Sequence, residues 1–317
     1  MGNGDFKKEI PVFLIILMIL LNTGCHMTDS RQRPVETKRI HHNGYDRTYS
    51  YYVPENVNAA CPLVIILHQS KASGSKIRKI LKYRFDELAD QQNFIVLYPD
   101  GYGGNWNDFR VEPKDSAHKM EMDDTGFIST LIDDFVQKYS INKSKVYVFG
   151  MSGGGHMAMR LATEIPQKIA AIAPAVAQIP VKDNLKCDKI NHALPVMLIS
   201  GTKDPISPYE GGQISLFGLF LRQGGVFSVS KTVAYFVENN NISIKPVVNS
   251  YPSDHLQKTM WVEKKVWDEP GKPEMRHYIV HGGGHTLPGG KHLPSIIYGK
   301  TSDNVVIADE VVSFFLK

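Results

Sequence analysis

The chain has little cysteine, and this excludes a fold held together by disulfides or by a cysteine-rich metal centre. Only Cys25, Cys61 and Cys187 occur in 317 residues. Small disulfide scaffolds are far richer in cysteine, and no cysteine or histidine spacing here fits a metal site. If Cys25 serves another purpose, Cys61 and Cys187 remain as two free thiols or as one disulfide. Sequence leaves both open, because it does not give the Cα separation that a bridge requires.

The chain also lacks an excess of charge of one sign. The formal net charge is +4, and basic residues are scattered among acidic ones. Nucleic-acid-binding proteins usually carry a concentrated basic footprint, which is missing here. Internal repeats and low-complexity tracts are absent as well. We therefore expect a globular protein with no nucleic-acid partner, whose ligand is neutral or mixed in charge.

Long hydrophobic runs are absent except near the N-terminus. Lys7 and Lys8 precede an apolar run from Ile10 to Leu21, which is followed by Asn22-Thr23-Gly24-Cys25. A run of about a dozen residues is too short to cross a bilayer of about 30 Å, but it suits an export signal. The Gly24-Cys25 ending resembles a bacterial lipobox, although Asn22 departs from it. We predict an export signal over residues 1–25 and leave open whether Cys25 is lipidated, so the protein would be extracellular, periplasmic or anchored by lipid.

Strands and helices alternate along the rest of the chain. Residues 26–44 are polar and aperiodic, which predicts a tether, and a single catalytic domain is expected over residues 45–317. Residues 47–53 alternate like an edge strand, and the apolar run 62–67 is typical of a central strand. Further strands are expected at 94–98, 146–149, 170–175, 195–200 and 277–280, and helices over 77–88, after Asp124, over 156–164 and over 304–316. This alternation predicts an α/β fold whose mostly parallel sheet is covered by helices on both faces.

The pentapeptide Gly150-Met151-Ser152-Gly153-Gly154 lies between a predicted strand and a predicted helix. A GxSxG sequence in this context is typical of a nucleophile elbow, a sharp turn that exposes the serine hydroxyl. The flanking glycines avoid collisions with neighbouring strands. The alternative is a glycine-rich turn with a purely structural role. We predict that Ser152 is a nucleophile.

A serine hydroxyl needs a histidine to accept its proton and an acid to orient that histidine. In enzymes with this elbow, the acid and then the histidine follow the serine on loops after later strands. Asp204 follows the strand at 195–200, and His285 follows the strand at 277–280 after three glycines. Asp204 is also the kind of residue that solvated turns favour, and His281 is an alternative base. The aspartates that are less well placed to be the acid are Asp123, Asp124 and Asp254.

An oxyanion intermediate needs backbone N–H donors. The residue after the nucleophile, Gly153, supplies one of them. The loop after the central strand is expected to supply the other, which makes Ser70 the candidate. His68, in the same loop, precedes the nucleophile in the chain, and we interpret it as a residue that shapes this loop.

In these residues and in several further blocks, the chain resembles the polyhydroxybutyrate depolymerase and feruloyl esterase family of secreted α/β hydrolases, which is similar to carbohydrate esterase family one. The resemblance runs from about Tyr51 to the C-terminus. Its blocks are Leu67-His68, Tyr98-Pro99-Asp100-Gly101, Asn105-Trp106-Asn107-Asp108, residues 123–128, the elbow, residues 201–205, residues 208–212 and residues 282–289. It implies an α/β-hydrolase fold, a triad of Ser152, Asp204 and His285, and an oxyanion donor at Ser70. Departures are His68-Gln69-Ser70 in place of His-Gly-Cys, Leu287 in place of a frequent tryptophan, and a third glycine after the elbow serine.

We therefore expect an exported carboxylic-ester hydrolase that forms an acyl-enzyme and needs no cofactor. The resemblance implies hydroxyalkanoate polyesters or their oligomers, or feruloyl and acetyl esters of polysaccharides, as substrates. Trp106 and residues 206–260 are expected to shape the site, and residues 214–221 would line an acyl pocket or simply pack in the core. Two alternatives remain open: a serine peptidase of the same fold, and a catalytically silent binding lipoprotein.

Overall fold

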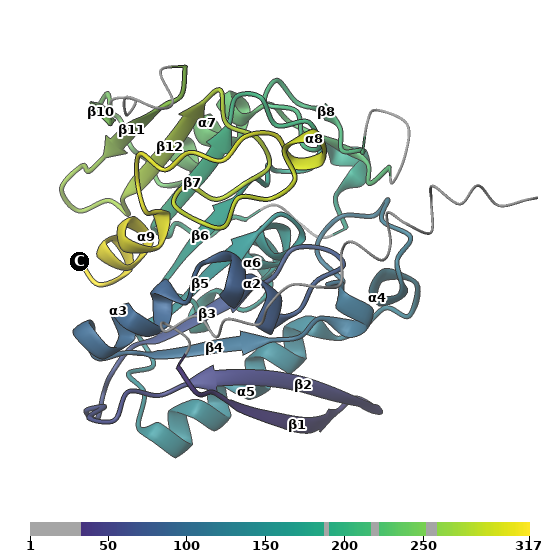
Figure 1. Cartoon of the computed structure of the whole chain (residues 1–317), viewed down its shortest axis with the longest axis vertical. Coiled ribbons are helices and arrows are strands. Elements are labelled where there is room, and N and C mark those ends of the chain that lie inside the picture. The colour runs from purple at the N-terminus through teal and green to yellow at the C-terminus, as the bar shows by residue number, and fades with distance from the viewer. Residues whose placement is uncertain (1–32, 187–189, 217–221, 252–258) are drawn as a thin grey trace, which may run out of the picture. The chain divides into compact units, whose positions relative to one another are not determined.

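The computed structural model describes residues 33–186, 190–216, 222–251 and 259–317. In this part of the chain one sheet has ten strands in the order β1-β2-β4-β3-β5-β6-β7-β12-β11-β10 (Figure 1). Its strands are β1 (Glu36–His42), β2 (Tyr45–Tyr52), β3 (Leu63–Leu67), β4 (Ile95–Pro99), β5 (Val146–Met151), β6 (Ala171–Ala175), β7 (Val196–Gly201), β10 (Val247–Tyr251), β11 (Trp261–Trp267) and β12 (Met275–His281). A separate ribbon pairs β8 (Gly212–Gln213) with β9 (Gly225–Val226).

The middle of the sheet is parallel, as expected. The strands β4, β3, β5, β6, β7 and β12 run in the same direction, and β3 lies between β4 and β5. Every residue of β3 to β7 is buried, which explains why these strands are continuous apolar runs in the sequence. Antiparallel strands extend both edges, with β1 and β2 at one edge and β10 and β11 at the other.

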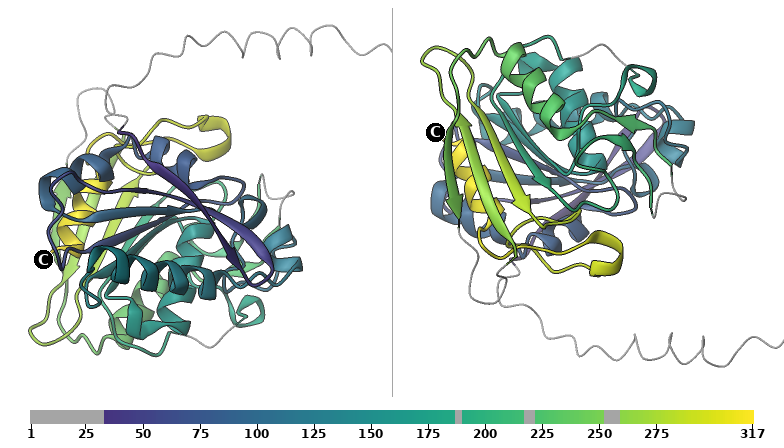
Figure 2. Two further views of the ribbon diagram at one scale, coloured as in Figure 1. Left: turned by 90° about the horizontal axis from the view of Figure 1, so that it is seen from below. Right: turned by 90° about the horizontal axis from the view of Figure 1, so that it is seen from above.

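Helices cover both faces of the sheet, which confirms the predicted architecture (Figure 2). The helices are α2 (Gly74–Ile80), α3 (Arg84–Gln92), α4 (Ser116–Lys119), α5 (Asp124–Tyr139), α6 (Gly153–Glu164), α7 (Val229–Asn239), α8 (Ser295–Tyr298) and α9 (Ile307–Phe315), with short 3₁₀ turns at 102–104, 166–168 and 182–184. Residues of α5, α6 and α7 belong to one hydrophobic core, and residues of α2, α3 and α9 belong to a second. The two cores lie on opposite sides of the sheet because successive strand residues point to opposite faces.

Three expectations at the N-terminal side are wrong. Strand β1 lies within residues 26–44, where a tether is predicted, so ordered structure begins before Tyr45. Consequently β2 is not an edge strand, since it pairs with both β1 and β4. The helix expected over residues 77–88 is broken at Lys82 and Tyr83, whose φ values are 52° and 60°. A left-handed conformation at two successive residues cannot continue an α-helix.

The helix expected after Asp124 begins one residue earlier, so that Asp124 is its first residue and Asp123 is its cap. Asp123, and not Asp124, accepts a hydrogen bond from the N–H of Gly126 at 2.9 Å. Asp124 is buried in the first turn, where one carboxylate oxygen lies 2.5 Å from Arg47 and the other accepts the N–H of Asn107 at 2.7 Å. Asp124 is therefore used to join the N-terminal strands to α5, which makes it unavailable as a triad acid.

Some predictions fall on residues that the structure does not describe. The export signal with Cys25, and also Cys187 and Asp254, lie outside the described residues. Cys61 is a free thiol, only 2% exposed, and burial raises its pKa. Within the described ranges, no helix has the length and hydrophobicity needed to cross a bilayer.

The parallel strands bring the predicted site residues together at their carboxyl ends. The strands β3, β5, β7 and β12 are parallel, and each is followed by a loop that carries a candidate residue. These loops begin at His68, Ser152, Thr202 and Gly282. In α/β sheets, ligands bind beyond the carboxyl ends of the strands, which is where these loops meet.

Candidate active site

Ser152 stands at a strained turn between β5 and α6. Its φ and ψ are 54° and −117°, values that a residue with a side chain rarely adopts. A Cβ added to Gly150 would lie 2.1 Å from the carbonyl oxygen of Gly154, and one added to Gly154 would lie 2.3 Å from that of Leu67. The turn is therefore so tight that only glycine fits at both positions. The geometry is that of a nucleophile elbow.

Asp204 and His285 are in direct contact, as the sequence predicts. Asp204 Oδ2 lies 2.7 Å from His285 Nδ1, and both side chains are nearly excluded from solvent, with 3% and 4% exposure. The other carboxylate oxygen accepts the N–H groups of Ile206 and Ser207, each at 2.8 Å. An ionised carboxylate has no proton to donate, so Asp204 accepts the hydrogen bond and Nδ1 of His285 is the protonated nitrogen. Nε2 of His285 then remains free to accept a proton.

The His285 loop is held by backbone contacts. The N–H of His285 donates to the carbonyl of Tyr298 at 2.6 Å. A Cβ on Gly284 would lie 2.1 Å from the same carbonyl oxygen. The loop after β12 therefore packs tightly against α8, and glycine before the histidine permits this close approach.

The alternative base and the alternative acids have other roles. His281 Nε2 lies 3.0 Å from Glu263, and its ring stacks on Trp261 with 3.7 Å between centroids. Asp123 caps α5 and contacts His42 at 2.9 Å. Within the described residues, the structure thus joins Asp204 to His285 and places His281 in a separate cluster at the start of β11.

The two predicted oxyanion donors lie side by side. A Cβ on Gly153 would lie 3.4 Å from the backbone nitrogen of Ser70. Gly153 is the first residue of α6, where the N–H has no carbonyl available from the preceding turn. The N–H of Ser70 makes no hydrogen bond within the described part of the chain. An oxyanion hole requires two neighbouring N–H groups of this kind, so the positions of Gly153 and Ser70 are compatible with the predicted role.

His68 shapes the loop that carries Ser70. Its Nδ1 lies 2.8 Å from the carbonyl of Gln69, and its Nε2 accepts the N–H of Gly101 at 2.9 Å. Trp106 donates its indole N–H to the His68 carbonyl at 2.9 Å. Burial lowers the pKa of His68 to about 4, so the ring is neutral at pH 7. The prediction that His68 shapes this loop is confirmed. Trp106 helps to hold the same loop through its hydrogen bond to the His68 carbonyl.

Sequence reasoning missed a buried ion pair behind the elbow. Arg110 contacts Asp108 through Nε at 2.9 Å and Nη2 at 2.6 Å, and its Nη1 donates to Gln223. Burial opposes ionisation of Asp108, but Arg110 and His118 outweigh this and lower its pKa. A Cβ on Gly153 would lie 3.8 Å from Arg110 Nη2, so the pair supports the turn that carries Ser152. In the sequence, Asp108 was noticed only as the last residue of the block Asn105-Trp106-Asn107-Asp108. That block does not indicate that Arg110 is the partner of Asp108.

A second missed residue, Gln178, holds the loop of the acid. Its Nε2 donates to the Pro208 carbonyl at 3.0 Å, and its Oε1 accepts the hydroxyl of Ser207. Ser207 also donates its N–H to Asp204. Gln178 therefore fixes the loop after β7 and so positions Asp204. A lone glutamine after a strand carries no signal in a sequence.

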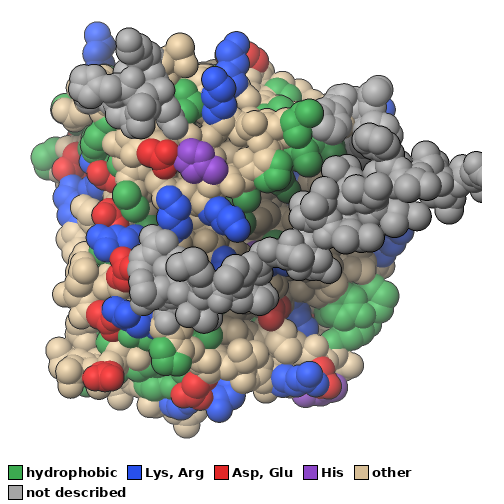
Figure 3. All heavy atoms as spheres, in the orientation of Figure 1, with side chains coloured by type: hydrophobic (Ala, Val, Ile, Leu, Met, Phe, Trp, Pro, Cys, Tyr) green, Lys and Arg blue, Asp and Glu red, His purple; other side chains and the backbone are tan. Residues whose placement is uncertain are grey.

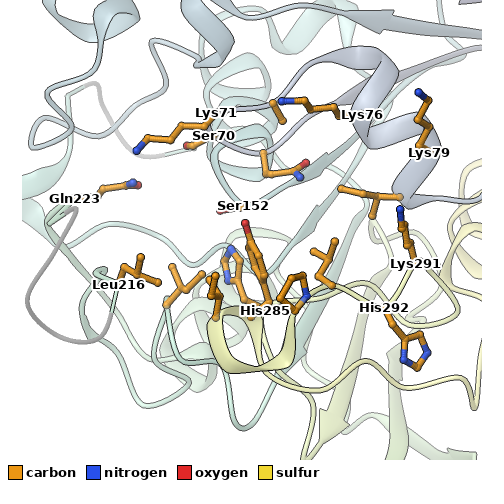
Figure 4. Close-up of a pocket in the computed structure, with 18 of the residues that line it drawn as sticks. Ser70, Lys71, Lys76, Lys79, Ser152, Leu216, Gln223, His285, Lys291 and His292 are labelled. Atoms are coloured by element: carbon orange, nitrogen blue, oxygen red, sulfur yellow. The ribbon is translucent and has the colours of Figure 1, made fainter. Parts of the chain in front are cut away.

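Ser152, His285 and Ser70 line a cavity of about 500 Å³ (Figure 4). Ser152 lies in its middle, with His285 beside it and Ser70 on the opposite wall. Apolar side chains from the loops after β7 and β12 form part of the lining, namely Ile206, Leu216, Leu293, Pro294 and Ile297. Leu216 lies in the range predicted to line an acyl pocket or to pack in the core, and it lines the cavity, whereas residues 217–221 lie outside the described part. In the described part of the chain, no cluster of three or more potential metal ligands is found.

Comparison with known proteins gives a consistent picture. A family described as "Esterase PHB depolymerase" matches residues 47–207. "Putative esterase NocK" of Nocardia uniformis subsp. tsuyamanensis is 25% identical over 263 residues, covering 80% of this chain and 74% of that protein. "Feruloyl esterase B" of Piromyces equi is 25% identical over 239 residues, covering 73% of this chain but only 41% of the relative. The structure of an acetyl xylan esterase from Aspergillus awamori covers 80% of this chain and 95% of its own, with a TM-score of 0.53 and 16% identity, which supports the α/β-hydrolase fold.

Proposed function

Since the chain belongs to the esterase PHB depolymerase family and is an esterase, we propose that it cleaves carboxylic esters with Ser152 as nucleophile, His285 as general base and Asp204 as the orienting acid. The observation that carries this proposal is the 2.7 Å contact between Asp204 and His285 in the cavity that Ser152 also lines. A neutral histidine held in one tautomer is what a serine hydroxyl requires in order to become a nucleophile.

The proposed reaction proceeds in two steps. Ser152 Oγ attacks the ester carbonyl while His285 Nε2 takes its proton, and the N–H groups of Gly153 and Ser70 stabilise the oxyanion. His285 then protonates the departing alcohol, which leaves an acyl group on Ser152. Water, deprotonated by His285, releases the acid and restores the serine. Besides the ester and water, these steps use only side chains and backbone groups of the chain.

The substrate and the location are also proposals. The names of the related proteins support hydroxyalkanoate oligoesters or polyesters, and feruloyl or acetyl esters of polysaccharides. A cavity of about 500 Å³ with an apolar wall is large enough for such groups. Lys7, Lys8 and the apolar run that follows support export, with Cys25 as a candidate for lipidation. Such an anchor is the membrane contact that we propose, alongside a small or polymeric ester as partner.

Hydrolysis of a short ester panel tests this function. The panel contains p-nitrophenyl acetate and butyrate, methyl ferulate, and hydroxybutyrate oligomers. The variant Ser152→Ala serves as the inactive control. We expect turnover that Ser152→Ala loses, and the preferred ester selects among the substrate classes. Absence of turnover from folded protein, with activity on peptides or simple ligand binding instead, would contradict the proposal and favour a peptidase or a binding protein.

A further inference from the structure

The charged residues that line the active-site cavity are all lysines. They are Lys71, Lys76, Lys79 and Lys291, and no aspartate or glutamate is part of the same lining. Figure 4 shows Lys76, Lys79 and Lys291 on one side of Ser152, and Lys71 beside Ser70. On the face that Figure 3 shows, Lys and Arg side chains are spread among acidic ones, with some of them near the middle. The cavity thus concentrates positive charge in a chain whose net charge is only +4.

The fold holds the lysine-bearing segments together. Lys76 and Lys79 are three residues apart on α2, so they share one face of that helix. The N–H of Lys291 donates to the carbonyl of Ile80, at the end of α2, at 2.7 Å. Lys71 directly follows Ser70, the candidate oxyanion donor. The contact between Lys291 and Ile80 therefore brings the lysine of the loop after β12 next to those of α2.

Among the described residues, no carboxylate pairs with these four ammonium groups. Within the described residues none of them forms an ion pair or a side-chain hydrogen bond, whereas Lys168, Lys264 and Lys317 each contact a carboxylate. All four lysines are exposed, so their charges remain available to a ligand. Like charges near one cavity repel each other within a Debye length of about 8 Å, and an anion in the cavity would relieve this repulsion. What sets these four lysines apart from other exposed lysines is that they line the same cavity as Ser152 and His285.

The remaining lining restricts the kind of anion. Ile206, Leu216, Leu293, Pro294 and Ile297 form an apolar wall, which favours a short hydrocarbon portion. A highly charged ligand would leave this wall uncovered. The combination suits a molecule that carries one carboxylate a few bonds away from its ester group.

We propose that this esterase prefers esters that carry a free carboxylate, with the hydrocarbon portion against the apolar wall and the carboxylate among Lys71, Lys76, Lys79 and Lys291. This inference rests on the proposed serine-ester hydrolysis and names its substrate class. The carboxylate belongs either to the acid portion of the ester or to its alcohol portion. A hydroxyacid oligomer with a free end, and an ester of a carboxylate-bearing sugar, share this chemistry.

Matched substrate pairs test the inference on the full-length protein. For the alcohol side, release of acetate from 3-acetoxybutyrate is compared with release from its methyl ester. For the acid side, release of methanol from monomethyl adipate is compared with release from methyl hexanoate. In at least one pair we expect kcat/KM of the anionic ester to exceed that of the neutral one by about five- to tenfold at low ionic strength. Added salt should reduce this ratio, because it screens exposed charges.

The double variant Lys76→Met/Lys291→Met should bring the ratio close to one, because kcat/KM of the anionic ester falls more than that of the neutral ester. The matched control is Lys143→Met/Lys145→Met, which removes the same charge from exposed residues just before the amino end of β5. A ratio of one or below for both pairs in the unmodified protein, or a ratio that the cavity variant leaves unchanged, would overturn the inference. Loss of all turnover, including that of neutral esters, would instead overturn the proposed function.

Discussion

Asp204 and His285 are separated by 81 positions in the chain, yet Oδ2 of the first lies 2.7 Å from Nδ1 of the second. The contact exists because β7 and β12 are parallel neighbours, so the loops that follow them begin side by side at the carboxyl ends of the two strands. The two backbone N–H groups that bind the other oxygen of Asp204 fix the direction of its carboxylate. The orientation of the histidine is thus determined by the fold.

Asp204→Asn should lower kcat by about 10³- to 10⁴-fold with little loss of stability. An amide in this position no longer selects the tautomer with a proton on Nδ1, so Nε2 is less able to accept the proton of Ser152. Steady-state kinetics on a p-nitrophenyl ester measures the loss. Glu263→Gln is the matched control, since Glu263 contacts His281 in the same manner. A similar kcat loss in both variants would contradict the assignment.

Replacement of His281, at the end of β12, and of His285, in the loop that follows, separates the roles of the two histidines. His285→Asn should abolish turnover, because no other residue in the described part of the chain contacts Asp204 as a base. His281→Asn should change kcat by less than about threefold, since its ring stacks on Trp261 away from the triad. If His281→Asn were the inactive variant, the base would have to be reassigned.

Gly154→Ala should destabilise the protein by about 3 kcal/mol and reduce activity, because its new Cβ would approach the Leu67 carbonyl oxygen to 2.3 Å. Urea unfolding measures the change in free energy. Gly271→Ala is a useful comparison, since that glycine has a φ of +77° but nothing within 4 Å of an added Cβ. It should cost only about 1 kcal/mol of backbone strain. Equal losses would show that the elbow is not sterically closed.

The stability should fall with rising pH because of His118. Burial alone would lower its pKa, but contacts with Asp108 and Asp115 outweigh this and raise it to about 9. A folded-state pKa above the unfolded value of 6.5 stabilises the protein fully below pH 6.5, and this contribution is lost as the pH rises through about 9.

Urea unfolding at pH 6 and pH 9.5 should therefore show a loss of up to about 3 kcal/mol that His118→Asn removes. A pH dependence that is identical in the variant would show that His118 does not carry the shift.

The parts of the fold that were predicted from sequence share one property, which is that their signal is local. Buried parallel strands such as β3 are continuous apolar runs, and the site residues lie in loops directly after them. The strands of the large sheet that were missed are β1, β10 and β11. They are exposed or half-buried over most of their length and carry mixed polar residues, so no period separates them from loops. The break between α2 and α3 was missed because Lys82 and Tyr83 are ordinary residues in an unusual conformation.

Only those site residues that belong to a recognisable sequence motif were predicted. The triad candidates stand in recognisable turns, whereas the supporting residues are defined by partners that are distant in the chain. Arg110 and Gln223 are 113 positions apart, and Gln178 and Ser207 are 29 apart. The lysines of the cavity come from two segments that meet through one backbone hydrogen bond, between Lys291 and Ile80. An overall charge of +4 does not reveal such local concentration.

The central claim is that Ser152 becomes covalently acylated, and its most direct test is labelling with a reagent that mimics the acyl group. After treatment with diethyl p-nitrophenyl phosphate, intact-mass and peptide measurements should show one diethylphosphoryl group on Ser152, with matching loss of esterase activity. Ser152→Ala and His285→Asn should remain unlabelled. Labelling of another residue, or full esterase activity in Ser152→Ala, would contradict the account.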